Sequence, residues 1–161
     1  MDMTFKRDLL RLTRQMKPAS IVVLGGECSL FDDYLHSVQH SRILCVSHGD
    51  YLTGIRALSR VDLAFVSGVL GRLDKAEAEH LLAQLRDVYA QRVVVAVRDS
   101  ENAPWEENDF LAMGMYRIGT YDMGADEIKV YTFDLYDYKP TPDWLNSKDW
   151  AHPELYDKHW W

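Results

Sequence analysis

Cysteine and long apolar runs are both scarce in this sequence of 161 residues. The two cysteines, Cys28 and Cys45, are well separated and lie in apolar surroundings, so the sequence indicates neither a disulfide framework nor a zinc cluster. We expect both to be buried free thiols, which favours a cytoplasmic protein. The longest apolar runs, such as residues 93–97, fall far short of the roughly 20 residues that cross a bilayer, so we expect no membrane partner.

Basic side chains are also fewer than acidic ones. Lys and Arg total 18 against 25 Asp and Glu residues, which gives a formal net charge of −7. Residues 1–80 carry ten basic and ten acidic side chains, so the whole excess of negative charge lies in residues 81–161. Affinity for nucleic acids comes mainly from Lys and Arg side chains that neutralise phosphates. We therefore expect no large nucleic-acid-binding surface.

Motifs of several enzyme classes are missing as well. The sequence has no Gly-x-Ser-x-Gly elbow, no Walker loop and no His-Glu-x-x-His pair, so hydrolase, nucleoside-triphosphatase and zinc-protease interpretations have no motif behind them. His36 and His40 have the spacing of a metal-binding pair on a helix, but nothing else in the sequence supports a metal site.

The one basic segment, residues 1–17, has the pattern of an amphipathic helix. Its apolar residues recur every three or four positions, at Phe5, Leu9, Leu12 and Met16. We expect this helix to lie on the core with its basic face in solvent. Contact of that face with nucleic acid or an anionic membrane is the alternative.

Four continuous apolar runs predict strands that are buried on both faces. They lie at residues 20–24, 42–47, 61–67 and 92–97. Segments of helical character lie between them, at residues 29–38, 51–59 and 75–91. The last helix is the clearest, because Asp74 and Glu77 form a capping-box pattern at its start. Its predicted buried residues are Leu81, Leu82, Leu85 and Val88.

A further helix and two strands complete the predicted domain. The helix begins near Pro104 and ends at Gly114, with inward-facing residues at Phe110, Leu111 and Met113. Residues 115–121 and 126–138 are strand-like, and the short turn between them predicts an antiparallel hairpin. The whole order predicts a single α/β domain over residues 1–138. Its fold is a Rossmann-like, open, mostly parallel sheet with helices on both faces and a C-terminal antiparallel hairpin.

Residues 139–161 differ in composition from the predicted domain. They contain three prolines, which exclude a long helix or a central strand, and four of the five tryptophans of the chain. Each buried aromatic side chain removes about 150–250 Å² from water, so such a segment should dock on a surface. We expect a docking arm rather than a separate domain. Its target is either its own domain or a second subunit or other protein partner.

The order of elements between residues 21 and 135 resembles the class I S-adenosylmethionine (SAM)-dependent methyltransferase fold. Residues 61–97 resemble the fourth strand, the following helix and the fifth strand of that superfamily. The runs M-G-M-Y-R-I-G-T-Y and I-K-V-Y-T-F-D-L resemble its closing sixth and seventh strands. The interval between Asp50 and Val61 hardly has room for the superfamily's third strand, which we expect to be reduced or missing. The tryptophan-rich end also resembles a small, uncharacterised family of bacterial proteins.

This resemblance implies SAM as the cofactor, but the loop that would hold it departs from the superfamily's G-x-G-x-G pattern. The corresponding run is Gly25-Gly26-Glu27-Cys28-Ser29, in which only the first glycine matches. Glu27 places bulk and negative charge beside the expected position of the cofactor's carboxylate. The superfamily's ribose-binding acidic residue is replaced by Ser47, with Asp50 as a substitute nearby, and loss of the third strand would remove the residue that contacts adenine.

Physical reasoning places the candidate site independently of the resemblance, because ligands of open parallel sheets bind outside the carboxyl ends of the strands. The residues at those ends are Gly25, Gly26, Glu27, Ser47, His48, Asp50, Ser67, Gly68, Arg98 and Asp99. His48 and Asp50 near Glu27 could act as acid–base groups or as metal ligands. An exposed loop histidine is the plainer interpretation of His48.

Three functions are compatible with these observations. We expect a non-catalytic binding or interaction protein of methyltransferase-like fold, with a degenerate SAM loop. The alternative is an active SAM-dependent methyltransferase with an atypical loop. In it Gly25 and Gly26 approach the methionine part, Asp50 holds the ribose, and the methyl acceptor lies near residues 67–70. The third interpretation makes residues 139–161 the functional element, through oligomerisation or partner binding.

Overall fold

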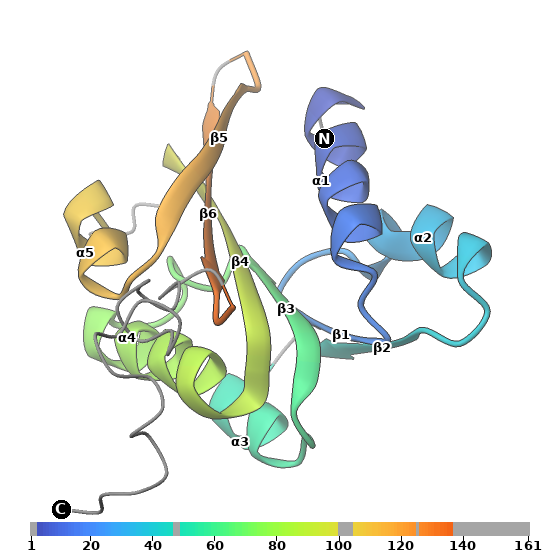
Figure 1. Cartoon of the computed structure of the whole chain (residues 1–161). Helices are drawn as coiled ribbons and strands as arrows, with labels where there is room; N and C mark the ends of the chain where they lie inside the picture. The colour runs from blue at the N-terminus through green and yellow to red at the C-terminus, as the bar shows by residue number, and fades with distance from the viewer. Residues whose placement is uncertain (1–2, 47–48, 100–104, 125, 137–161) are drawn as a thin grey trace, which may run out of the picture.

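One six-stranded sheet organises the chain (Figure 1). The computed structural model describes residues 3–46, 49–99, 105–124 and 126–136. The strand order across the sheet is β2-β1-β3-β4-β6-β5. The parallel strands are β1 (Ser20–Leu24), β2 (Arg42–Val46), β3 (Val61–Ser67) and β4 (Ala90–Arg98). The antiparallel strands are β5 (Tyr116–Asp122) and β6 (Glu127–Asp134), and β6 lies between β4 and β5.

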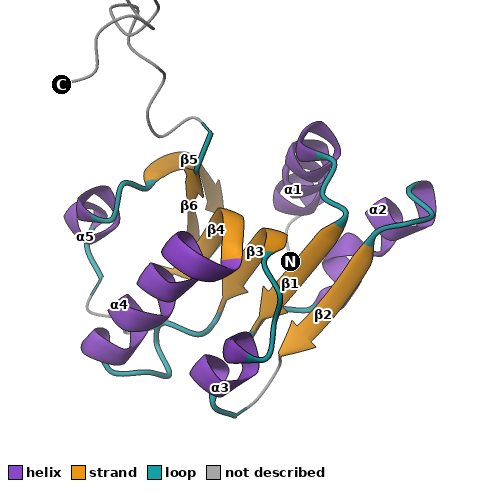
Figure 2. Cartoon of the chain, turned by 60° about the horizontal axis from the view of Figure 1, so that its bottom comes forward, coloured by secondary structure: helices purple, strands orange, loops and turns teal. Residues whose placement is uncertain are grey.

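Helices cover both faces of this sheet (Figure 2). The α1 face is covered by α1 (Met3–Met16), the 3₁₀ turn η1 (Cys28–Phe31) and α2 (Asp32–Ser37). The α4 face is covered by α3 (Tyr51–Arg56), α4 (Lys75–Gln84), the π-turn η2 (Leu85–Tyr89) and α5 (Glu107–Ala112). Successive β1 residues point to opposite faces, as strand geometry requires, so each face has its own apolar core. The predicted α/β fold class, including the closing hairpin, is confirmed.

The third strand of the methyltransferase pattern is missing. The described residues between β2 and β3, 49–60, contain α3 and no strand. The order in the sheet therefore makes β2 an edge strand, and the two helices beside it, α2 and α3, have only six residues each. Residues 42–47 had the apolar pattern of a strand buried on both faces, but Leu44 is 45% exposed. That expectation was wrong because β2 lies at the edge of the described sheet, next to helices of only six residues.

The segment predicted as one helix at 75–91 is a helix followed by a π-turn. Asp74 and Glu77 form the predicted capping box at the start of α4, and Leu81, Leu82 and Leu85 are buried as expected. Val88 is 49% exposed, however. Val88 lies within this π-turn, whose residues are spaced more widely around the axis than those of an α-helix, so the α-helical spacing does not bring Val88 to the core.

One other inward-facing prediction was also wrong, near the end of the short helix α5. Leu111 on the six-residue helix α5 is 51% exposed, whereas its neighbour Phe110 is buried.

The two cysteines form a disulfide between η1 and β2, so the prediction of two buried free thiols was wrong. The Cα atoms of Cys28 and Cys45 are 6.2 Å apart, inside the usual range for such bonds. Cys45 is exposed on the edge strand, and Cys28 is partly buried. The two cysteines are 17 residues apart in the sequence, and this spacing did not indicate that they pair. The argument from reduced thiols to a cytoplasmic location therefore loses its premise.

Two further expectations concern a membrane span and the docking arm. In the described part of the chain, no helix is long and apolar enough to span a membrane. The docking arm predicted at residues 139–161 lies outside the described residues.

Candidate functional site

The loop after β1 crosses the ends of its two neighbouring strands in close backbone contact. Gly25 has a φ of +70°, and its N–H donates to the carbonyl oxygen of Val46 at the end of β2, at 2.9 Å. A Cβ on Gly25 would lie 2.6 Å from the carbonyl oxygen of Ser67 and 2.5 Å from Cγ2 of Val69. Only glycine fits this position, because contacts within the chain itself already require it.

Gly26 and Gly68 complete this crossing. A Cβ on Gly26 would lie 3.2 Å from the ring of Phe65 and 3.4 Å from Cβ of Ser67, so the backbone lies tightly over the end of β3. Gly68 has a φ of +68°, which turns the chain directly after β3. The structure therefore brings four of the predicted residues, Gly25, Gly26, Ser67 and Gly68, into one backbone junction.

Glu27 follows this junction and is exposed. Its side chain makes no capping hydrogen bond to η1, although its carbonyl oxygen accepts from the N–H of Leu30 at 3.2 Å. Within the described ranges, no Lys, Arg or His forms a salt bridge with it. Arg98, which could have balanced it, lies at the end of β4, two strand spacings or about 10 Å across the sheet.

Asp50 serves as the N-cap of α3. Its carboxylate accepts hydrogen bonds from the Oγ1 of Thr53 and from the N–H of Thr53, the latter at 3.2 Å. The side-chain hydrogen bond, followed by the backbone one, lowers the pKa of Asp50 below its ordinary value. A lowered pKa makes this carboxylate a weak general base, so its evident role is to start α3. Ser47 and His48, its predicted companions, lie outside the described residues.

A pocket of about 310 Å³ lies farther along the same edge of the sheet, between β4, α5, β5 and β6. Its volume is at the lower end of the range for small-molecule sites. The lining residues are Val97, Asp99, Trp105, Glu106, Glu107, Phe110, Arg117, Lys129 and Tyr131. Of these, only Asp99 was a candidate from the sequence. The others come from four separate segments that the hairpin and α5 bring together, and no local pattern connects them.

Three aromatic rings form the apolar part of this pocket. The ring centroids of Trp105 and Phe110 are 5.0 Å apart, and those of Phe110 and Tyr131 are 4.0 Å apart in a nearly parallel stack. Tyr131 is only 2% exposed, and burial, together with the negative charge of Glu107, raises the pKa of its hydroxyl. Nε1 of Trp105 is buried and has no acceptor in the part of the chain that the structure describes.

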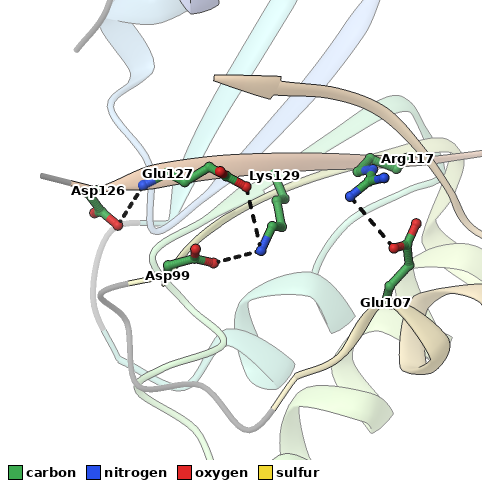
Figure 3. Close-up of polar contacts among 6 residues, drawn as sticks. All are labelled: Asp99, Glu107, Arg117, Asp126, Glu127 and Lys129. Carbon is green, nitrogen blue, oxygen red and sulfur yellow. Dashed lines mark hydrogen bonds and ion pairs between the residues drawn. The ribbon is translucent and has the colours of Figure 1, made fainter. Parts of the chain in front are cut away.

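Ion pairs form the polar rim of the pocket (Figure 3). Nζ of Lys129 lies 3.0 Å from Oδ1 of Asp99 and 3.6 Å from Glu127, and the hydrogen bond with Asp99 raises the pKa of the Lys129 ammonium group. Nη1 of Arg117 lies 3.6 Å from Oε2 of Glu107. These pairs are partly exposed, and such pairs stabilise a fold by at most about 1 kcal/mol. The rim can therefore exchange its internal partners for the charges of a ligand.

No metal centre can be assigned from the described ranges, which contain no group of three or more His, Cys, Asp or Glu side chains suited to a metal ion. The arrangement offers a backbone junction at β1 and β3 and a charged, aromatic pocket at β4 and β6. In this pocket the rings of Phe110 and Tyr131 are buried against each other, so the partly buried Trp105 and the charged rim are the parts that a ligand could contact.

One known protein family matches almost the whole chain. A model of a family of unknown function, DUF6231, matches residues 3–161. The chain belongs to the DUF6231 family. No curated protein matches this DUF6231 sequence.

Solved structures similar to this DUF6231 chain include proteins named as methyltransferases. The N-terminal domain of EvdMO1 with bound SAH has a TM-score of 0.55 at 10% identity over 80% of both chains. Magnesium protoporphyrin IX methyltransferase (ChlM) from Synechocystis PCC 6803 with bound SAM has a TM-score of 0.56 at 8% identity, over 80% of this chain and 77% of that one. A putative O-methyltransferase from Nostoc punctiforme PCC 73102 has a TM-score of 0.55 at 11% identity, over 80% and 55%. At these identities the likeness shows a methyltransferase-like fold and nothing more specific.

Proposed function

We propose that this DUF6231 protein is a methyltransferase-like binding protein that does not transfer methyl groups. The observation that carries the proposal is the charge of Glu27, which has no salt-bridge partner among the described residues and occupies the place of the second glycine of the superfamily's loop. The carboxylate of SAM would lie beside it. Two negative charges about 4 Å apart repel by about 1 kcal/mol in water and about 4 kcal/mol near a protein surface. Repulsion of this size weakens SAM binding about fivefold or more.

Two further features support the same proposal. Gly25, the one glycine that matches the superfamily's loop, is required by its contacts with Ser67 and Val69 whether or not a cofactor is present. The described residues between β2 and β3 contain no third strand, so the acidic residue that the superfamily carries there for the adenine has no counterpart.

The pocket between β4, α5, β5 and β6 is the site that we propose for the ligand. Its partly buried Trp105 ring suits contact with a flat apolar group, and its rim presents two cations and several carboxylates. Ligand-observed NMR with small charged aromatic compounds tests this assignment. We expect binding compounds to lose their signal change with the Lys129→Met variant and to keep it with Lys6→Met. Lys6 pairs with Asp33 on the other face of the sheet, and equal loss in both variants would contradict the assignment.

Calorimetric titration with SAM and with S-adenosylhomocysteine tests the role of Glu27. We expect no measurable binding to the wild-type chain at about 1 mM ligand, and binding at least about fivefold tighter to Glu27→Gln. Glu79→Gln is the matched control, because it removes the same charge from an exposed position on α4. Micromolar binding to the wild-type chain, unchanged in Glu27→Gln, would contradict the proposal.

An active methyltransferase with an atypical loop is the second candidate. One observation favours it: Gly25 and Gly68 keep positive φ angles at the ends of β1 and β3, so the backbone turns of a ligand-binding edge are present. In this case Gly25 and Gly26 would approach the methionine part of SAM, and Asp50 would hold the ribose. Wild-type binding of SAM in the same titration would favour this candidate.

A further inference from the structure

The bond between Cys28 and Cys45 has no role in the proposed ligand site, yet it lies beside the loop after β1. We propose that these cysteines form a thiol–disulfide exchange site that controls the order of that loop and of the edge strand β2. The inference does not depend on which ligand the protein binds. It rests on where the two cysteines lie, how exposed they are and how little else fixes β2.

The disulfide joins the covering layer of the α1 face to the edge of the sheet. Cys28 begins η1 and follows Glu27 directly, and it packs against the core of the α1 face. Cys45 lies opposite Val23 in the parallel register of β1 and β2, and Val23 belongs to the same core. Formation of the bond therefore fixes the end of the loop after β1 to the last part of β2.

The exposure of the two residues indicates which sulfur an external thiol meets first. Cys45 is exposed on a strand at the edge of the described sheet, whereas Cys28, at the start of η1, is partly buried. Exchange rates depend on the access of the attacking thiolate to a sulfur atom. We assign the sulfur of Cys45 as the point of attack and Cys28 as the leaving thiolate.

The exchange needs a small thiol of the glutathione class, and it proceeds in two steps. Its thiolate attacks Sγ of Cys45, the bond between Cys45 and Cys28 breaks, and Cys28 leaves as a thiolate that takes up a proton. A second thiolate then attacks the sulfur of the bound thiol, which releases Cys45 as a thiolate and forms a small-molecule disulfide. The protein gains two electrons and two protons, and two thiols are oxidised to one disulfide.

Non-covalent contacts hold β2 weakly, so the bond matters most there. None of the five residues of β2 is fully buried, whereas β3 has five fully buried residues and β4 has six. Local opening is easiest where few apolar contacts are buried. Reduction should therefore loosen the loop after β1, η1 and β2, and leave the centre of the sheet unchanged.

Hydrogen–deuterium exchange of the full chain, oxidised and then reduced with glutathione, tests this. We expect exchange in peptides from residues 25–46 to become about tenfold faster on reduction, with no change in peptides from β3, β4 and β6. The midpoint of thermal unfolding should fall by about 5–10 °C, because closing a loop of this length stabilises the folded state. The double variant Cys28→Ser, Cys45→Ser should reproduce the reduced behaviour and no longer respond to glutathione.

Trapping the intermediate tests the order of attack. In Cys28→Ser, treatment with oxidised glutathione should leave a mixed disulfide on Cys45 that peptide mass spectrometry detects. The matched variant Cys45→Ser should form the adduct on Cys28 more slowly, because that residue is partly buried. Two results would overturn the proposal. They are the absence of the bridged form at every ratio of oxidised to reduced glutathione, and identical exchange at residues 25–46 in both redox states.

Discussion

The sheet edge that carries the candidate site has two halves: backbone packing forms one of them, and side chains form the other. At the ends of β1 and β3 the chain packs backbone against backbone, and Gly25 leaves no space for even a methyl group. At the ends of β4 and β6 side chains surround a pocket of about 310 Å³, with stacked rings and partly exposed ion pairs. Strand order alone would place a cofactor at the first half. The side chains point instead to the second, which illustrates that function depends on the site rather than on the fold.

The largest effect that this comparison predicts is on the tight half. In Gly25→Ala the new Cβ would meet Val69 at 2.5 Å and the carbonyl oxygen of Ser67 at 2.6 Å, at a φ of +70° that L residues rarely adopt. Strain and overpacking together should lower the free energy of unfolding by about 3 kcal/mol. Thermal denaturation should show a midpoint lower by about 6–12 °C.

Gly124→Ala provides the matched control for this variant. Gly124 also has a positive φ, +85°, but a Cβ there would meet nothing within 4 Å. It should therefore cost only the backbone strain, about 1 kcal/mol. If Gly25→Ala unfolds no earlier than Gly124→Ala, the junction of β1 and β3 is not packed as described.

A smaller effect is expected from the rim of the pocket. Lys129→Met removes the ion pairs with Asp99 and Glu127, whose side chains are partly exposed, and such pairs contribute at most about 1 kcal/mol. The unfolding midpoint should change by less than about 4 °C. A fall as large as that of Gly25→Ala would show that these charges serve the fold rather than a ligand.

The smallest predicted effect concerns pH. Asp109 caps α5 by accepting from the N–H of Glu106, and it also pairs with Lys75 at 2.9 Å; these contacts lower its pKa from the ordinary 3.8. A lowered folded-state pKa means that its contribution is complete above the unfolded value and is lost as the pH falls through the folded value.

Asp109→Asn keeps a similar shape but cannot titrate. At neutral pH we expect the wild-type chain to melt about 2–3 °C higher than this variant. The difference should shrink as the pH is lowered below about 4, because protonated Asp109 then resembles asparagine. Melting curves between about pH 7 and pH 3 measure this, and a constant difference over that range would contradict the assignment.

Much of the fold followed from local patterns. Apolar runs marked all four parallel strands, and the pair Asp74 and Glu77 marked the start of α4, because these signals depend only on neighbours in the sequence. The exposure of β2 was not predicted, although a reduced or missing third strand was, because the apolar pattern of residues 42–47 does not show that this strand lies at the edge of the sheet. The exposure of Val88 was not predicted either, since a π-turn has no propensity signature in this sequence.

The candidate site was predictable only in part, for the same reason. Gly25, Gly26, Ser67 and Gly68 were found because the ends of parallel strands always share one edge of the sheet. The disulfide and most of the pocket were missed, because their partners become neighbours only when η1 folds over β2 and α5 folds against the hairpin.

Thermal unfolding of the wild-type chain with and without SAM and S-adenosylhomocysteine tests the central claim most directly. A ligand at 100 times its dissociation constant adds about 2.7 kcal/mol to the stability of the folded state. For a chain of this size that would raise the midpoint by roughly 5–11 °C. We predict a shift below about 1 °C with either compound at about 1 mM, because Glu27 opposes the cofactor's carboxylate. A shift of roughly 5 °C or more would contradict this account and identify a SAM-binding protein.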